Sequence, residues 1–296
     1  MFALSPHPLV PSLCQKMGIQ EGVVTRRSFP DGESYLRVDT PVKDRACIVL
    51  AELAHPDGKY LPLAFLLTTL REFGASSVGL VAPYLSYMRQ DRRFVAGEAL
   101  TSRIFANLLS AQIDWLVTVD PHLHRYHELD EIYSVPTRVV QGAPALADWL
   151  KGQTNLLLVG PDAESEQWVA ELARRSGHPF VVGAKRRYGD RDVVVTLPDL
   201  SPYGDRTAVI IDDVISSGQT ILKCMEALQQ QGIARISCAG VHGIFAEGVD
   251  KTLMQRGLQQ LITTNSIAHT SNVVDLTDSL IEPIRQFIPI SVGHSG

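Results

Sequence analysis

Short apolar runs alternate with longer amphipathic stretches along most of the chain. The runs ACIVLAEL (46–53) and SSVGLVAPYL (76–85) are typical of strands that are buried on both faces. The stretch LPLAFLLTTLREFG (61–74) between them is typical of a helix, because it is too long for a buried strand. The same order continues with a helical pattern at 100–112 and a strand pattern at 114–120. This alternation predicts an α/β protein with mainly parallel sheets flanked by helices.

The alternating pattern occurs twice. In the first half, a strand beginning at Arg45 precedes a helix ending at Gly74. In the second half, a strand beginning at Arg206 precedes a helix ending near Gly232. Each terminal glycine suits the left-handed residue that ends many helices. The sequence therefore predicts two tandem domains of similar fold that meet near the polar stretch at 141–144. The predicted segments are a first domain at 1–142, a second domain at 143–290 and a frayed tail at 291–296.

Composition and charge exclude several classes of protein. The 296 residues are 45% hydrophobic and 20% charged, which is typical of a globular protein long enough for two domains. The net charge of −5 argues against a general binder of nucleic acid or of anionic membranes, and no apolar run approaches the length of a membrane span. The start of the chain lacks a basic segment and is a poor signal peptide. We expect a cytoplasmic protein, because the four scattered cysteines form no CxxC pair and suit buried thiols: Cys14, Cys47, Cys224 and Cys238.

The stretch TAVIIDDVISSGQT (207–220) carries the clearest candidate site. Its apolar run at 208–211 predicts a buried strand that ends in two acids, and Gly218 begins the turn into a helix. Backbone N–H groups at a helix start can hold a phosphate. The adjacent carboxylates of Asp212 and Asp213 can accept hydrogen bonds from vicinal hydroxyls or share a Mg²⁺ ion. The motif predicts a sugar-phosphate site, with a solvated acidic turn as the alternative.

The corresponding loop of the first half differs. It reads ELAHPD (52–57) and lacks both the paired acids and the Ser-Ser-Gly turn. One half has therefore kept the phosphate loop and the other has lost it. We expect the first half to contribute a second substrate site instead.

Three further loops carry charged or aromatic groups. RRSFPDGESYLR (26–37) predicts a hairpin around Pro-Asp-Gly, which is either purely structural or a holder for a planar base between Phe29 and Glu33. PYLSYMRQDRR (83–93) follows a strand, where its arginines suit a phosphate, or it is a solvated charged loop. AKRRYGDRD (184–192) places three cations on a hairpin, either to protect a strand edge or to close over a polyphosphate.

Histidines and an aspartate follow two other strands. Three histidines lie in DPHLHRYH (120–127), but no cysteine accompanies them, so an imidazole beside a Mg²⁺–phosphate site is as natural as a zinc ligand. His122 lies nearest the strand end. Asp162 follows the strand LLLVG (156–160) and either binds Mg²⁺ or caps the helix through Trp168.

The stretch 207–220 resembles the phosphoribosyl pyrophosphate signature of type I phosphoribosyltransferase folds. Ser217 stands where Thr is usual and keeps the hydroxyl, while Gln219 stands where Gly is common. From about Phe2 to Ile288, the chain also resembles the ribose-phosphate diphosphokinase family, or phosphoribosyl pyrophosphate synthetases. This resemblance implies two tandem type I phosphoribosyltransferase-like domains with the ribose site in the second. The motifs that carry it are FPDGE, YMRQDRR, TVDPH, GPD, KRR and IIDDVISSGQT.

The resemblance implies a role for each motif. The flexible-loop residues Lys185 and Arg187 would be the catalytic cations. Metal would be held by His122, Asp162, Asp212 and Asp213. Ribose 5-phosphate would be held by Asp212, Asp213, Ser216, Ser217, Gly218, Gln219 and Thr220. ATP would be held by Arg89, Gln90, Asp91 and His122, with Phe29, Asp31 and Glu33 reaching its adenine from a neighbouring subunit.

The implied reaction transfers the β,γ-diphosphoryl group of ATP to the C1 hydroxyl of ribose 5-phosphate and releases AMP. The implied cofactor is Mg²⁺, and the implied assembly is a dimer-based homo-oligomer with the adenine site near a subunit interface. Ser216 stands where many bacterial members carry a third acid. With Pro121 and the short loop at Lys185, this departure resembles the archaeal-type branch more closely than the bacterial one.

Three alternatives stay open. A salvage phosphoribosyltransferase would use the loop at 212–220 to consume phosphoribosyl pyrophosphate, but it would need neither RRSFPDGE, nor RQDRR, nor a second domain. A catalytically inactive regulatory subunit would keep the fold but lose Lys185, His122 or the acid pair, all of which are present. Ser216 and Gln219 leave room for a different pentose phosphate.

Overall fold

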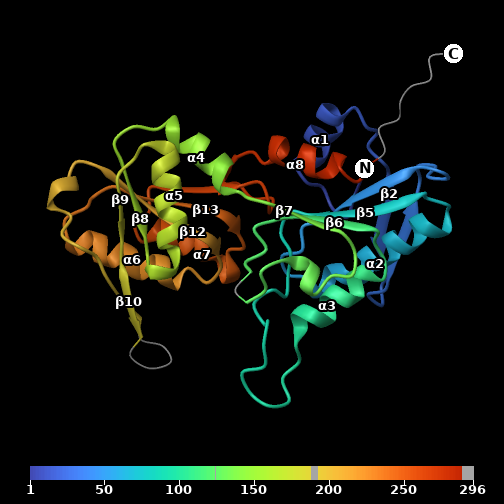
Figure 1. The fold of residues 1–296 in the computed structure, drawn as a ribbon, viewed down its shortest axis with the longest axis horizontal. Helices are drawn as coiled ribbons and strands as arrows, with labels where there is room; N and C mark the ends of the chain where they lie inside the picture. Colours follow the sequence, from blue (N-terminus) through green and yellow to red (C-terminus); the bar gives the residue numbers. More distant parts are fainter. Residues whose placement is uncertain (124, 188–192, 289–296) are drawn as a thin grey trace. The chain divides into compact units, whose positions relative to one another are not determined.

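The computed structural model describes residues 1–123, 125–187 and 193–288, except for the side chains at 185–187 and 193. The chain forms two units, shown in Figure 1. One contains Met1–Gln141 together with the residues from Thr277 onward, and the other contains Gly142–Leu276. Each unit has its own parallel sheet flanked by helices, which confirms the predicted α/β class.

The first unit is built on a five-stranded sheet in the order β1-β4-β5-β6-β7, in which every strand pair is parallel. All residues of β6 are buried, as expected of an inner strand in a covered parallel sheet. An antiparallel hairpin pairs β2 with β3. The elements are β1 (Phe2–Ala3), α1 (Leu9–Met17), β2 (Val24–Ser28), β3 (Ser34–Val38), β4 (Ala46–Leu50), α2 (Asp57–Glu72), β5 (Ser77–Ala82), α3 (Thr101–Ser110), β6 (Trp115–Val119), η1 (Leu129–Glu131), β7 (Thr137–Val140) and α8 (Thr277–Arg285).

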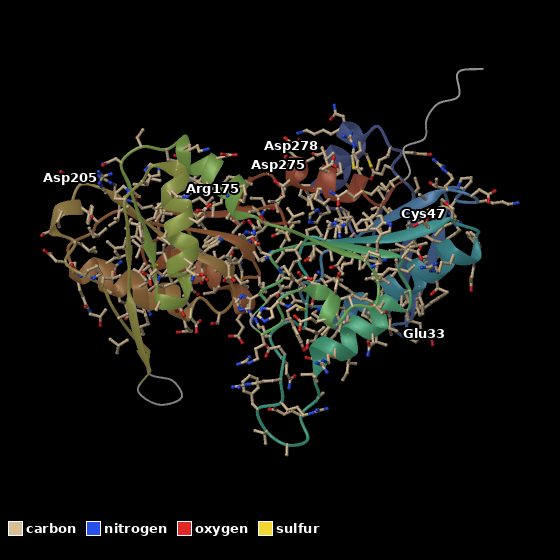
Figure 2. All side chains as sticks on the ribbon, viewed as in Figure 1. Glu33, Cys47, Arg175, Asp205, Asp275 and Asp278 are labelled. Atoms are coloured by element: carbon tan, nitrogen blue, oxygen red, sulfur yellow. The ribbon has the colours of Figure 1, made fainter. Side chains whose placement is uncertain are left out.

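The helix α8 belongs to the first unit, although the sequence placed residues 277–290 in the second domain. It packs beside α1, where Lys16 pairs with Asp278 at 2.7 Å (Figures 1 and 2). Just after α8, the ring of Phe287 stacks on Trp115 of β6 with centroids 5.0 Å apart. The apolar face of α8 is therefore buried against a sheet that lies more than a hundred residues earlier, which local periodicity does not encode.

The second unit is built on a six-stranded sheet in the order β15-β14-β13-β12-β8-β9, again parallel throughout. A separate antiparallel hairpin pairs β10 with β11. The elements are α4 (Ala143–Lys151), β8 (Leu156–Gly160), η2 (Ala163–Ser165), α5 (Glu166–Ser176), β9 (Phe180–Val182), β10 (Ala184–Arg187), β11 (Val193–Thr196), η3 (Ser201–Tyr203), β12 (Thr207–Ile215), α6 (Gln219–Gln230), β13 (Ile236–Gly243), η4 (Ala246–Gly248), α7 (Val249–Gln255), β14 (Gln260–Thr264) and β15 (Asn272–Val274).

Apolar side chains of β12 point alternately to two cores. Ala208 and Ile210 pack with α6 and α7 on one face of the sheet. Val209 and Ile211 pack with α4 and α5 on the other face. This alternation follows from the period of two in a strand, and it fixes the register of β12. None of the helices in the described part of the chain is long and apolar enough to cross a membrane.

We predict that Gly79→Ala destabilises the first unit by about 2 to 3 kcal/mol, because the added methyl group overpacks the core. Gly79 of β5 pairs with Trp115 of β6, and a Cβ atom there would lie 1.9 Å from the indole Cε2. Calorimetric melting should show the loss as a lower Tm.

Gly58→Ala is the matched control for this test. Gly58 lies within α2 and has no atom within 4 Å of its ideal Cβ position, so this change should stabilise the helix by about 0.5 to 1 kcal/mol. Equal Tm values for the two variants would contradict the packing argument.

Candidate functional site

The strand β12 carries two acids near its carboxyl end. Parallel ladders with β8 and β13 hold it on both sides. The register places Asp212 opposite Gly240, where a Cβ atom would lie 2.9 Å from the backbone oxygen of Asp212. The sequence predicted a strand ending in Asp212 and Asp213, and the structure extends it through Val214 and Ile215. The extension occurs because β13 pairs with β12 up to its last residue.

A glycine joins this strand to α6, as predicted, and its backbone is left-handed. Gly218 has φ 66° and caps the helix, and no side chain caps its start. A Cβ atom at Gly218 would lie 2.5 Å from Cγ2 of Val249, so only glycine fits both the backbone and the space. The exposed side chains of Ser217 and Gln219 flank this buried glycine. The start of α6 thus lies beside exposed side chains, and helix N-termini favour anions.

The acid pair is held in an environment that disfavours charge. Burial, together with the nearby Asp213 and Asp162 carboxylates, raises the pKa of Asp212 to about 8. Hydroxyl donors or a divalent cation would relieve this repulsion. Within the described residues, no three His, Cys, Asp or Glu side chains come together as a metal site. Asp212 and Asp213 offer adjacent carboxylates, the donor type that hard cations take.

Asp162 has a structural role in the described fold. Its carboxylate accepts the backbone N–H groups of Glu164 and Ser165, at 3.2 and 3.3 Å, and thereby caps η2. The sequence left open a cap on the helix through Trp168, and the structure instead places the cap on η2, which directly precedes that helix. The charge of Asp162 still reaches Asp212, since it contributes to the raised pKa of that group.

The cysteines are buried and unoxidised, as predicted (Cys47 is labelled in Figure 2). Burial, with the nearby carboxylates, raises the pKa of Cys224 to about 12 and that of Cys238 well above its usual range. Both thiols are therefore neutral and act as small apolar side chains beneath the acid pair.

Strained backbone marks the carboxyl edge of the first sheet. The loops after β4, β5 and β6 all contain non-glycine residues with positive φ, namely His55 (53°), Tyr87 (61°), Asp120 (33°) and His122 (56°). Each such residue costs about 1 to 2 kcal/mol, and strain of this kind collects at ligand sites. The predicted ATP contacts Arg89 and His122 lie in these loops. This edge therefore has the backbone features of a ligand site, at the position where parallel sheets bind ligands.

Asp91 supports the loop after β5 from within. Its side chain is only 1% exposed, and its Oδ1 accepts a hydrogen bond from Nη1 of Arg125 at 2.7 Å. The hydroxyl of Tyr126 bonds to the backbone oxygen of Asp91. The ion pair joins the loop after β5 to the loop after β6, so the structure gives Asp91 a supporting position beside the exposed Arg89 and the half-buried Gln90.

The stretch at 26–37 forms the hairpin that its Pro-Asp-Gly turn predicts. Phe29 donates its N–H to the oxygen of Glu33 at 2.8 Å, and Asp31 accepts the N–H of Glu33 at 3.1 Å. The guanidinium of Arg27 lies 4.4 Å from the Phe29 ring and 4.5 Å from the Tyr35 ring. The three residues predicted to border adenine are exposed at the hairpin tip.

The predicted catalytic cations lie on the other hairpin. Lys185 and Arg187 belong to β10 and pair with Val195 and Val193 of β11. Their side chains, and residues 188–192, lie outside the described part of the structure. The strand pairing therefore gives their backbone position alone.

The sequence analysis missed the segment 244–250, which follows β13. The N–H of Ala246 bonds to the oxygen of Ser216 at 3.1 Å, and Val249 touches Gly218. The parallel ladder between β13 and β12 puts the segment after β13 at the same edge of the sheet as the acid pair. Its sequence, IFAEGVD, contains none of the motifs that pointed to the site.

Comparisons with known proteins cover both units. Residues 1–112 match the N-terminal domain of ribose phosphate pyrophosphokinase, and residues 129–258 match the phosphoribosyl transferase domain. A ribose-phosphate pyrophosphokinase of Methanobrevibacter smithii is 31% identical over 275 residues, which are 88% of this chain and 91% of the relative. That of Methanopyrus kandleri is 30% identical over 277 residues, which are 92% and 94% of the two chains. Both are archaeal, as the resemblance predicted.

A solved structure agrees in fold over both units. The crystal structure of phosphoribosylpyrophosphate synthetase from Mycobacterium smegmatis matches with a TM-score of 0.80. The match covers 96% of each chain at 22% identity. At that identity the likeness shows a shared fold of two phosphoribosyltransferase-like units.

We predict that Gly218→Ala destabilises the second unit more than Gly232→Ala does. Both glycines are left-handed, at φ 66° and 81°, so backbone strain should lower the free energy of unfolding of both variants by about 1 kcal/mol. Only Gly218 also has a close neighbour, which should add about 1 to 3 kcal/mol. Urea unfolding of the two variants measures the difference, and equal losses would refute the contact with Val249.

We also predict that Asp212→Asn changes how stability depends on pH in metal-free buffer. The pKa of Asp212 is raised from 3.8 to about 8 in the folded chain. Between these values the folded chain keeps a proton that the unfolded chain has released, so stability falls as pH rises through this window. The slope is at most about 1.4 kcal/mol per pH unit. Asp212→Asn should lack this pH dependence. The Tm of the variant minus that of the wild type should therefore increase from pH 5 to pH 8.

Asp205→Asn is the control for the pH experiment. Asp205 is exposed in the same unit and is labelled in Figure 2. Its Tm difference from the wild type should stay constant over this pH range. Parallel curves for the wild type and Asp212→Asn would show that the Asp212 carboxyl is not in the repelling environment described above.

Proposed function

Because the chain belongs to the ribose-phosphate pyrophosphokinase family, we propose that its second unit binds ribose 5-phosphate on the loop that follows β12. The chain is a transferase, as predicted. It transfers the diphosphoryl group of ATP to ribose 5-phosphate, giving 5-phosphoribosyl 1-diphosphate and AMP. The observation that carries the proposed site is the left-handed turn at Gly218, which begins α6 a few residues after the acid pair.

The loop from Ser216 to Thr220 would hold the 5-phosphate. It lies at a helix start and carries hydroxyl side chains, which are favourable features for holding a dianion. Asp212 and Asp213 would accept hydrogen bonds from the ribose hydroxyls. Gln219 is exposed, so its larger side chain does not block the loop.

The equivalent loop in the first unit supports this assignment by contrast. There the carboxylate of Glu52 accepts the N–H of Ala54 at 3.1 Å and pairs with Lys59. The helix α2 then begins with Asp57, whose charge opposes an anion at a helix start. The first unit thus fills its own loop with a carboxylate, whereas the loop after β12 carries Ser-Ser-Gly at the corresponding place.

The family uses metal ions, and we propose Mg²⁺ for this chain. The fit rests on the acid pair, because two adjacent carboxylates are the hard oxygen donors that Mg²⁺ takes. The raised pKa of Asp212 results first from burial and then from the Asp213 and Asp162 carboxylates, and a bound cation would oppose it. When bound, the ion would supply charge neutralisation beside the reacting phosphates. Asp162 would interact with the ion electrostatically or through a water molecule. His122 would be one of the residues that bind ATP.

ATP would bind to residues of the first unit. The guanidinium of Arg89 suits a phosphate, and the strained loop at His122 suits a residue held in position for a ligand. The exposed hairpin tip would present Phe29, Asp31 and Glu33 to the adenine of a neighbouring subunit. This last assignment requires a homo-oligomer, which we propose to be built on dimers. Its location would be the cytoplasm, which the buried free thiols support.

The chemistry is an in-line displacement at the β-phosphorus of ATP. The C1 hydroxyl oxygen of ribose 5-phosphate forms the new P–O bond, the bond between the β-phosphorus and the bridging oxygen of the α-phosphate breaks, and AMP carries away that oxygen. The hydroxyl proton leaves to solvent or to a phosphate oxygen. Lys185 and Arg187 would offset the charge that develops on the leaving oxygen, so positioning and cations carry the catalysis without a strong general base.

A direct assay tests this function. The protein is incubated with ATP, Mg²⁺ and ribose 5-phosphate, and AMP is followed by chromatography and ³¹P NMR. AMP that forms only in the presence of the sugar phosphate supports the proposal. Consumption of phosphoribosyl pyrophosphate with a free base would instead indicate salvage, and no turnover would indicate a regulatory subunit.

In this assay we predict that Lys185→Ala lowers kcat about a hundredfold or more, because the leaving oxygen loses a cation. The KM for ribose 5-phosphate should stay near that of the wild type, since the sugar phosphate is held elsewhere. Lys151→Ala is the control, because Lys151 is an exposed residue of α4 that pairs with Asp148 in the same unit. Equal turnover in Lys185→Ala and the control would remove Lys185 from catalysis.

A further inference from the structure

The segment 244–250 holds the end of β12 through its backbone. The carbonyl oxygen of Ile215 accepts the N–H groups of Ile244 and Phe245, at 3.0 and 3.1 Å. The carbonyl oxygen of Ser216 accepts the N–H of Ala246 at 3.1 Å. The three bonds reach the last residue of β12 and the first residue of the proposed phosphate loop. The position of that loop is therefore tied to the conformation of segment 244–250.

The backbone conformation of this segment is unfavourable unless surrounding contacts support it. Phe245 and Glu247 both have positive φ, at 51° and 56°, and Gly248 follows at 73°. Left-handed backbone is rare for a bulky aromatic residue and persists only where surrounding contacts impose it. The Phe245 side chain is buried, which points to packing as the cause.

His269 supplies that packing. Its ring lies against the Phe245 ring, with centroids 4.5 Å apart and planes inclined by 48°. Its Nε2 lies 3.6 Å from Oδ2 of Asp250, at the far end of the same segment. Its Nδ1 lies 2.8 Å from the hydroxyl oxygen of Ser271, which in turn lies 2.7 Å from that of Thr263. Ser271 and Thr263 are buried. His269 thus joins the segment to the buried end of β14.

We propose that His269 and Phe245 are positioning residues for the sugar-phosphate substrate. His269 fixes Phe245 and Asp250, Phe245 fixes the strained backbone, and that backbone fixes the carbonyl groups of Ile215 and Ser216. The inference rests on the proposed function of the loop at 216–220. It assigns a kinetic role to two residues that lie outside the loop and its acids.

The proposal has a specific kinetic signature. All the residues in this chain of contacts belong to the second unit, whereas the proposed ATP contacts belong to the first. Loosening His269 should therefore weaken ribose 5-phosphate binding and leave ATP binding nearly unchanged. A residue that only stabilised the fold would change neither KM once the protein is folded.

Two substitutions at His269 separate the ring contact from the polar contacts. His269→Asn keeps an amide near Ser271 but removes the ring and the reach to Asp250. We expect it to raise the KM for ribose 5-phosphate about tenfold, with the KM for ATP within about twofold, because small displacements of a substrate-holding loop are costly. His269→Phe keeps the ring on Phe245, so it should recover part of the loss.

His178→Asn is the matched control. His178 is a half-buried histidine of the same unit whose Nε2 contacts the oxygen of Leu150, remote from segment 244–250. It should leave both KM values unchanged. A wild-type KM for ribose 5-phosphate in His269→Asn, or an equal rise in both KM values, would overturn the proposal. If His269→Asn fails to fold, Asp250→Asn is the second variant and should raise the KM for ribose 5-phosphate alone, about threefold.

Hydrogen exchange separates this inference from the proposed function. His269→Asn should speed amide exchange at 216–220 in the ligand-free chain, and His178→Asn should not. Unchanged exchange together with an unchanged KM rejects the positioning role. Faster exchange in a chain that makes no AMP from ATP and ribose 5-phosphate would reject the proposed function and the substrate role together, while keeping the mechanical link.

Discussion

The central position of β12 in the second sheet is the constraint on which the candidate site depends. Ladders on both edges and apolar cores on both faces prevent the strand from shifting. Its carboxyl end consequently brings Asp212 and Asp213 into a poorly solvated place where their charges repel, and the pKa of Asp212 is raised. Packing of the core thus holds the acid pair in an arrangement that is unfavourable in free energy, and a bound ligand would relieve it. Binding of hydroxyls or a cation is therefore linked to the stability of the folded unit.

The two units show how one backbone plan supports different uses. After β4, Glu52 turns inward and satisfies the loop with its own carboxylate and with Lys59. After β12, the acids precede the loop and the left-handed Gly218 begins the turn into α6. The difference lies in a few side chains at equivalent strand ends. The first unit has strained residues in the loops after β4, β5 and β6, and the second unit has them in the segment after β13.

Much of this arrangement could be predicted because it is local in sequence. Apolar runs gave the strands, and the spacing of glycine and paired acids gave the turn into α6. The contacts that could not be predicted join distant segments. The Asp91–Arg125 ion pair and the packing of His269 on Phe245 each depend on which loops become neighbours. Periodicity carries no information about such pairs. Resemblance to a family supplied residue roles that the pattern left open, and the roles of individual residues stay predictions.

The return of α8 to the first sheet makes the second unit an insertion within the first. The chain passes between the units twice, after Gln141 and after Leu276. During synthesis, the second unit is complete as one continuous segment before the last helix of the first unit leaves the ribosome. The surface of β6 and β7 that α8 covers stays exposed until α8 has been synthesised. The Trp115 ring lacks its stacking partner Phe287 until then. The unit that begins the chain is thus the last to finish folding.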